Sequence, residues 1–229
     1  VVALDGKTSR RAAKACEAPL HLVSAFAADV GIILGQQATA AKSNEKTAIP
    51  ELLASLALEG CIVTIDAMGT QPSIAQAIRD RQADYVLAVK ENQPQLKEAI
   101  EDFFVQFCAM PASQTPHQAK EDISKEHGRV ETRRCYVFDA LDCLPDPSRW
   151  PDLRSFAVIE ATREIQGKTT QERRYYISSL APDADALAKA VRQHWSIENQ
   201  VHWCLDVTFA DDQMRARTAH AGHNLAILK

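Results

Sequence analysis

Short continuous apolar runs alternate with segments of helical periodicity in the first half of the chain. Five apolar runs predict buried strands, at residues 1–5, 20–28, 32–38, 61–65 and 85–89. Three segments with helical apolar spacing follow or separate them, at residues 45–58, 72–82 and 95–107. The predicted order is β-β-β-α-β-α-β-α. This order is typical of an α/β sheet that is at least partly parallel and covered by helices on both faces.

The pattern changes after residue 107 and returns near residue 183. Residues 108–182 are more polar and irregular, with predicted strands at 129–138, 156–162 and 174–179. A capping segment at 183–185 then begins a long helix that is expected to reach about residue 205. We therefore expect a core formed by residues 1–107 and 183–229, with a β-rich insertion at 108–182.

Composition narrows the class of protein. The net charge of −4 is unlike that of a dedicated DNA-binding module, although metal-neutralised carboxylates or basic segments beyond either end would soften that argument. The chain starts inside an apolar run and stops inside a helical pattern, so both ends are expected to be cut from a longer protein. No membrane helix or signal peptide is predicted. None of the six cysteines forms a Cys-x-x-Cys pair, which indicates a reduced, cytoplasmic protein.

Three carboxylates stand out as candidates for chemistry. Asp5 and Asp66 each end a predicted strand, where ligand crevices of open α/β sheets form. Each also has an ordinary explanation as a turn former or helix cap. On a helical wheel Glu198 falls in the apolar stripe of the last helix, between His194 and His202. A carboxylate buried there costs several kcal/mol unless a cation, a salt bridge or a histidine pairs with it.

Three converging carboxylates without a cysteine cluster favour hard cations with oxygen ligands. Magnesium or manganese fit this donor set, and zinc fits it poorly. Two such ions can assist both the attacking and the leaving oxygen of a phosphodiester. The residues thus predict a two-metal site for phosphodiester chemistry.

Eight segments of the chain resemble the H-repeat-associated class of insertion-sequence DDE transposases. They are residues 4–8, 20–26, 42–45, 48–53, 64–69, 84–93, 131–134 and 194–206. The resemblance implies a ribonuclease H-like mixed sheet with flanking helices and a β-rich insertion before the last catalytic helix. It also implies that Asp5, Asp66 and Glu198 are the DDE triad and bind two Mg²⁺ or Mn²⁺ ions.

The chain departs from one signature of this class, Tyr-x2-Arg-x3-Glu-x6-Lys around the catalytic glutamate. The three matching positions here are Val191, His194 and Leu205, so the usual arginine and lysine are absent. His194 and His202 are candidates to replace them as DNA contacts, although histidine is only partly charged at neutral pH.

Other basic residues are candidate phosphate contacts, with a solvated surface charge as the alternative for each. Those near strand ends are Lys7, Arg10, Arg11 and Lys90, and those in the insertion are Arg133, Arg134, Arg173 and Arg174. Trp195 and Trp203 either stack on a flipped or terminal DNA base or pack against the sheet or the insertion.

The sequence therefore predicts a metal-dependent transposase catalytic domain that cuts transposon ends and joins them to target DNA. Its expected partners are double-stranded DNA and further copies of the chain, as a homo-dimer or higher assembly, in the bacterial cytoplasm at the nucleoid. Two alternatives stay open: a stand-alone metal-dependent DNA nuclease, and a non-catalytic, domesticated relative that acts as a DNA-binding scaffold.

Overall fold

The computed structural model describes residues 1–9, 20–39, 45–111, 115–126, 129–215 and 221–228. Within these residues one nine-stranded sheet has the order β3-β2-β1-β4-β5-β9-β8-β7-β6. The strands of its first part are β1 (Val2–Ser9), β2 (Leu20–Ala27), β3 (Ile32–Thr39), β4 (Ile62–Ile65) and β5 (Asp84–Val89). Those of its second part are β6 (Gln118–Glu126), β7 (Arg129–Phe138), β8 (Ser155–Ile165) and β9 (Lys168–Ser178).

The direction of the first five strands matches the predicted mixed sheet. β1, β2 and β3 pair antiparallel, whereas β1, β4 and β5 pair parallel. A parallel pair requires a crossover connection, and helices supply it here, as the alternating pattern predicted. The fold is therefore a ribonuclease H-like α/β arrangement with flanking helices.

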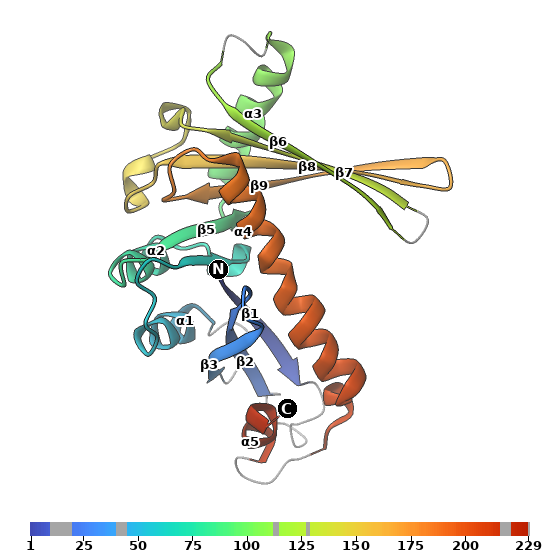
Figure 1. The fold of residues 1–229 in the computed structure, drawn as a ribbon. Helices are drawn as coiled ribbons and strands as arrows, with labels where there is room; N and C mark the ends of the chain where they lie inside the picture. The colour runs from blue at the N-terminus through green and yellow to red at the C-terminus, as the bar shows by residue number, and fades with distance from the viewer. Residues whose placement is uncertain (10–19, 40–44, 112–114, 127–128, 216–220, 229) are drawn as a thin grey trace.

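Helices cover both faces of the sheet (Figure 1). α1 (Glu45–Ala54), α2 (Pro72–Arg79) and α3 (Pro94–Ala109) pack on one face. α4 (Ala184–Ser196) crosses the other face and contacts β1, β4, β5, β6 and β7. Two π-helical segments, Ile197–His202 and Cys204–Thr208, continue α4, and α5 (Ala221–Leu228) follows. Short 3₁₀ turns lie at Ala67–Gly69, Leu141–Cys143, Pro147–Arg149 and Asp211–Gln213.

Alternation along the strands divides the core between the two helical layers. Leu87 of β5 lies in the cluster under α1, α2 and α3, whereas its neighbour Val86 packs with Leu187 and Val191 of α4. Both strand residues are buried because each face of the sheet is covered. None of the helices that the structure describes is long and apolar enough to cross a membrane.

The strands within residues 108–182 extend the same sheet. β9 pairs antiparallel with β5, and β8, β7 and β6 follow outwards. β6 was not predicted, because its sequence is polar and lacks apolar alternation. It forms as an edge strand because its backbone pairs with β7 along nine residues. β8 and β9 also run several residues beyond their predicted apolar parts and form a long hairpin.

Candidate active site

The parallel register of β1 and β4 places the two aspartates at equivalent positions. Leu4 pairs with Ile65, so Asp5 and Asp66 each follow the last parallel pair of these strands. The two strands are therefore neighbours, and this brings the two aspartates to the same edge of the sheet. The expectation that the first strand ends at Asp5 is wrong, because β1 continues to Ser9 by pairing with β2.

Asp5 sits in a partly buried position next to the start of that extension. Its Oδ1 accepts a hydrogen bond from the Gly6 amide at 2.8 Å, and its Oδ2 lies 3.5 Å from Nδ1 of His202. The pKa of Asp5 is raised to about 7, mainly by burial and also by the charges of Asp66 and Glu198, against the opposing hydrogen bond from Gly6. A nearby cation would favour the ionised form of this carboxyl group.

Asp66 is partly buried, and it has a structural role as well as a place in the lining of a pocket. Its Oδ1 accepts the Met68 amide at 3.0 Å and so caps the 3₁₀ turn at Ala67–Gly69. Asp66 is thus a helix cap, as the ordinary explanation of this residue predicted. The cap fixes one carboxylate oxygen and leaves the other without a hydrogen bond in this turn.

Glu198 lies where α4 changes into its π-helical continuation. The amide of Trp203 donates to the carbonyl of Glu198, five residues earlier, so this turn holds more residues than an α-helical turn. The wheel prediction that Glu198 is in the buried stripe is wrong, because Ile197 is fully buried and Glu198 is exposed. Burial nevertheless raises the pKa of Glu198, while the charges of Arg174 and Lys90 lower it.

The three carboxylates share one electrostatic neighbourhood. The charges of Asp66 and Glu198 both raise the pKa of Asp5, and that of Asp66 also raises the pKa of Glu198. Asp66 and Glu198 line one pocket of about 300 Å³, together with Lys90 and Arg174. In the part of the chain that the structure describes, no three acidic, thiol or imidazole groups form a closed metal-binding cluster.

The two histidines that flank Glu198 point into the protein. Nδ1 of His194 lies 3.0 Å from the hydroxyl oxygen of Thr64, and His202 lies against Asp5. Burial lowers the pKa of each imidazole to about 4, so both are neutral at pH 7. Nε2 of His202 is buried and has no hydrogen-bond partner within the described residues. The position of His202 favours orienting Asp5, that of His194 favours holding Thr64, and neither neutral ring is suited to binding DNA phosphates.

The predicted basic contacts are distributed over several surfaces. Lys7 is largely buried and pairs with Asp206 at 2.6 Å, whereas Lys90 is exposed at the carboxylate pocket. Arg133 lines a second pocket described below, and Arg134 points to the opposite face of β7 and pairs with Glu121. Arg10 and Arg11 lie outside the described residues.

The aromatic candidates also differ in position. Arg174 stacks over the ring of Trp195, with its guanidinium carbon 4.4 Å from the ring centroid. Trp203 is 55% exposed and so does not pack against the sheet. Arg173 pairs with Glu160 at 2.9 Å on the other side of β9 from Arg174.

A buried polar chain beneath Asp5 was not found from the sequence. Both ring nitrogens of His21 form hydrogen bonds. Nε2 lies 2.5 Å from Oε1 of Glu45, and Nδ1 lies 2.7 Å from the hydroxyl oxygen of Thr8. A Cβ atom at Gly6 would lie 2.5 Å from Oε1 of Glu45 and 2.6 Å from Nε2 of His21. The only sequence signal was that Gly6 and His21 lie in segments that resemble the transposase class.

Replacement of Gly6 by alanine will therefore destabilise the fold by about 1–3 kcal/mol, because the added methyl group overpacks the His21–Glu45 pair. Chemical denaturation measures this loss. Gly31, where an added Cβ atom would meet nothing but φ is +70°, serves as the comparison for backbone strain alone. A Gly6→Ala variant that is as stable as the unaltered chain would show that the His21–Glu45 pair can accommodate the methyl group.

Comparison with known proteins gives a consistent family. The model of the Transposase DDE domain family matches residues 1–229. The "Putative transposase YncI" of Escherichia coli O157:H7 is 40% identical over 238 residues, covering all of this chain and 60% of the relative. The "H repeat-associated putative transposase YhhI" of Escherichia coli strain K12 is 38% identical, covering 96% of this chain and 60% of the relative.

The chain thus spans about 60% of the length of these curated relatives. Among solved structures, a piggyBac transposase synaptic complex with hairpin DNA aligns with 99% of this chain and 43% of its own. The TM-score of that alignment is 0.49 and the sequence identity is 9%.

Proposed function

The chain belongs to the Transposase DDE domain family and has two H repeat-associated putative transposases among its relatives, and we therefore propose that it is the catalytic domain of an insertion-sequence transposase. It would hydrolyse a phosphodiester at each transposon end and join the freed 3′-hydroxyl group to target DNA. The observation that carries the proposal is the register of β1 and β4, which sets Asp5 beside Asp66, the residue that lines a pocket together with Glu198.

The donor set of this site suits divalent cations. The charges of Asp66 and Glu198 raise the pKa of Asp5, and a cation that enters would relieve this repulsion. Carboxylate oxygens are the preferred ligands of magnesium and manganese. Two such ions would assist the attacking oxygen and the leaving 3′-oxygen of an in-line displacement. Asp5, Asp66 and Glu198 are the residues that would hold them.

The chain's own residues position the carboxylates and the DNA in this proposal. The Gly6 amide and the neutral His202 ring orient Asp5, and the Met68 amide orients Asp66. Lys90 and Arg174 line the same pocket as Glu198 and would bind phosphate oxygens of the strand being cut. His194 and His202 would act on DNA only through the carboxylates.

Double-stranded DNA is the proposed substrate, as transposon end and as target. Further copies of the chain, as a homo-dimer or higher assembly, would hold two ends together. The bacterial cytoplasm, at the nucleoid, is the compartment in which this chemistry is proposed to take place.

A strand-transfer assay tests the function. A labelled duplex with the terminal repeat of the chain's own element is incubated with supercoiled plasmid and Mg²⁺ or Mn²⁺. Joined product that disappears with a chelator is expected. Cleavage without joining would favour the stand-alone nuclease, and DNA binding without either would favour the non-catalytic scaffold.

A further inference from the structure

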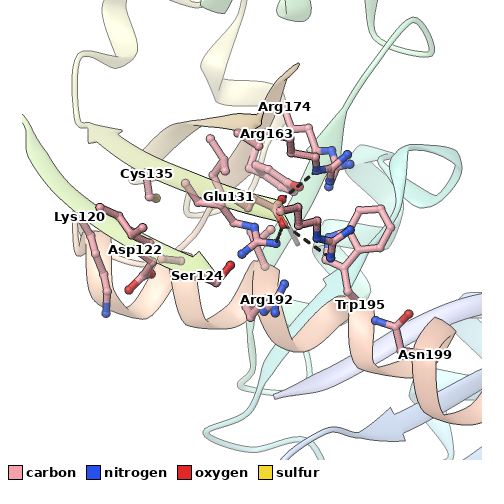
Figure 2. Close-up of a pocket in the computed structure, with 18 residues that line it drawn as sticks. Lys120, Asp122, Ser124, Glu131, Cys135, Arg163, Arg174, Arg192, Trp195 and Asn199 are labelled. Carbon is pink, nitrogen blue, oxygen red and sulfur yellow. Dashed lines mark hydrogen bonds and ion pairs between the residues drawn. The ribbon is translucent and has the colours of Figure 1, made fainter. Parts of the chain in front are cut away.

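A second and larger pocket lies between α4 and the strands that extend the sheet. It has a volume of about 460 Å³, and its floor includes the buried or nearly buried Cys135, Ile159 and Val191. Figure 2 shows Arg192 and Trp195 of α4, and Asn199 of the π-helical segment that follows it, with Glu131 and Arg163 opposite on the strands. The pocket is therefore formed between the four strands β6, β7, β8 and β9 on one side and α4 with its π-helical continuation on the other.

Basic side chains dominate the lining of this pocket. The lining has two acidic side chains, Asp122 and Glu131, and six basic ones. The basic side chains are Lys120, Arg129, Arg133, Arg163, Arg174 and Arg192. Burial lowers the pKa of Arg133, and the charges of Arg192, Arg163 and Arg129 lower it further, which shows that like charges crowd here. An anion that entered the pocket would relieve this crowding.

Glu131 arranges the arginines on the strand side. Its side chain is 1% exposed, with Oε1 2.9 Å from Nε of Arg163 and Oε2 2.6 Å from Arg133. Arg129 lies 3.9 Å from the same carboxylate. Because two guanidinium groups are anchored at one end by Glu131, their remaining N–H groups are held in place for another acceptor. Arg192, on the helix side, has no ion pair among the described residues.

The basic pocket adjoins the carboxylate pocket. Arg174, Tyr176 and Trp195 line both of them. Arg174 is held in position by Glu172, at 2.9 and 3.1 Å, and by the ring of Trp195. A polyanion that occupies the basic pocket would therefore reach the carboxylates past Arg174.

We propose that the pocket between α4 and the β6–β9 strands binds backbone phosphates of the DNA strand that leads into the carboxylate pocket, with Arg133, Arg163 and Arg192 as its phosphate ligands. This inference rests on the proposed function for its DNA substrate. The shared chemistry is recognition of phosphate oxygens, so a free nucleotide is the other source of the same ligand. The six basic side chains of the lining, and the three residues that it shares with the carboxylate pocket, favour a polymer.

The test measures binding separately from cleavage. Affinity of the 229-residue chain for a labelled 30-base-pair duplex is measured by fluorescence anisotropy in EDTA, over a range of salt concentrations, for Arg192→Gln. The slope of log affinity against log salt is expected to fall by about one unit for this variant. The double variant Arg133→Gln with Arg192→Gln is expected to bind roughly tenfold more weakly at physiological salt.

A matched control removes one positive charge from the same helix. Lys189 is exposed on α4 beside Asp29 and does not line the pocket, so Lys189→Gln is expected to keep the slope of the unaltered chain. Thermal unfolding confirms that each variant is folded. Equal slopes for Arg192→Gln and Lys189→Gln would overturn the proposal.

Two further arms separate the possible failures. ATP titrated in EDTA is expected to compete only weakly with the duplex. The DNA assignment would be overturned if ATP bound tightly and Arg192→Gln abolished that binding while duplex binding stayed unchanged. If binding falls as expected but Asp66→Asn still cleaves DNA, the proposed function fails and the phosphate pocket stands. If only the Arg192 effect is missing, the pocket fails and the proposed function stands.

Discussion

Asp66→Asn will lower metal-dependent DNA cleavage by about a thousandfold or more. Stabilisation by metal-bound oxygens contributes several kcal/mol to the transition state, and about 1.4 kcal/mol corresponds to a factor of ten in rate. Asparagine keeps the side-chain oxygen that accepts the Met68 amide, so the cap of the 3₁₀ turn is preserved. The loss therefore reports on the missing charge. Single-turnover cleavage of a labelled duplex in Mn²⁺ measures it.

An aspartate outside the site provides the control. Asp80 is exposed at the end of α2 and accepts a hydrogen bond from Gln76, so Asp80→Asn should leave the cleavage rate unchanged. Asp5→Asn and Glu198→Gln should each match the Asp66→Asn loss. Cleavage by Asp66→Asn within a few-fold of the unaltered chain would exclude this carboxylate from the reaction.

The positions of the two aspartates were accessible from the sequence because their signals are local. Each follows a short apolar run, and parallel neighbours place such residues at one edge of the sheet. What the pattern could not give was the length of β1, because residues after Asp5 are held in the strand by pairing with β2. Pairing with a distant strand leaves no trace in the spacing of apolar residues.

Glu198 shows a different limit of sequence reasoning. A helical wheel with a constant angle per residue assumes α-helical geometry. Its prediction of the buried face fails where each backbone N–H donates to the carbonyl five residues earlier. π-Helical turns frequently occur at functional sites. In this chain the turn buries Ile197 and leaves Glu198 exposed at the pocket, where a carboxylate can meet a substrate.

Part of the basic pocket could have been predicted from the sequence, but the sequence analysis did not predict it. Residues 129–138 were predicted as a strand, and alternation along a strand places Arg129, Glu131 and Arg133 on one face. That reasoning would have separated Arg133 from Arg134, which faces the other way. Arg163 and Arg192 come from elements further along the chain. Only the fold brings Arg163 to the carboxylate of Glu131 and Arg192 to the same pocket.

Glu131→Ala will lower the free energy of unfolding by about 2–3 kcal/mol. Removing one partner of a buried ion pair typically costs about 3–5 kcal/mol, because the other charge is left without compensation. The lower figure applies because Arg133 and Arg163 retain 25% and 37% side-chain exposure and can be partly solvated. Urea denaturation followed by circular dichroism measures the loss.

Glu121→Ala is the matched comparison, because Glu121 pairs with Arg134 on the exposed face of the same strand pair. That surface pair should be worth less than about 1 kcal/mol. Glu131→Gln adds a second readout, because it raises the positive charge of the pocket while loosening Arg133 and Arg163. If Glu131 positions these arginines, duplex binding in EDTA weakens despite the added charge. Tighter binding by Glu131→Gln would mean that the pocket attracts DNA by net charge alone, and equal losses for Glu131→Ala and Glu121→Ala would remove the structural role as well.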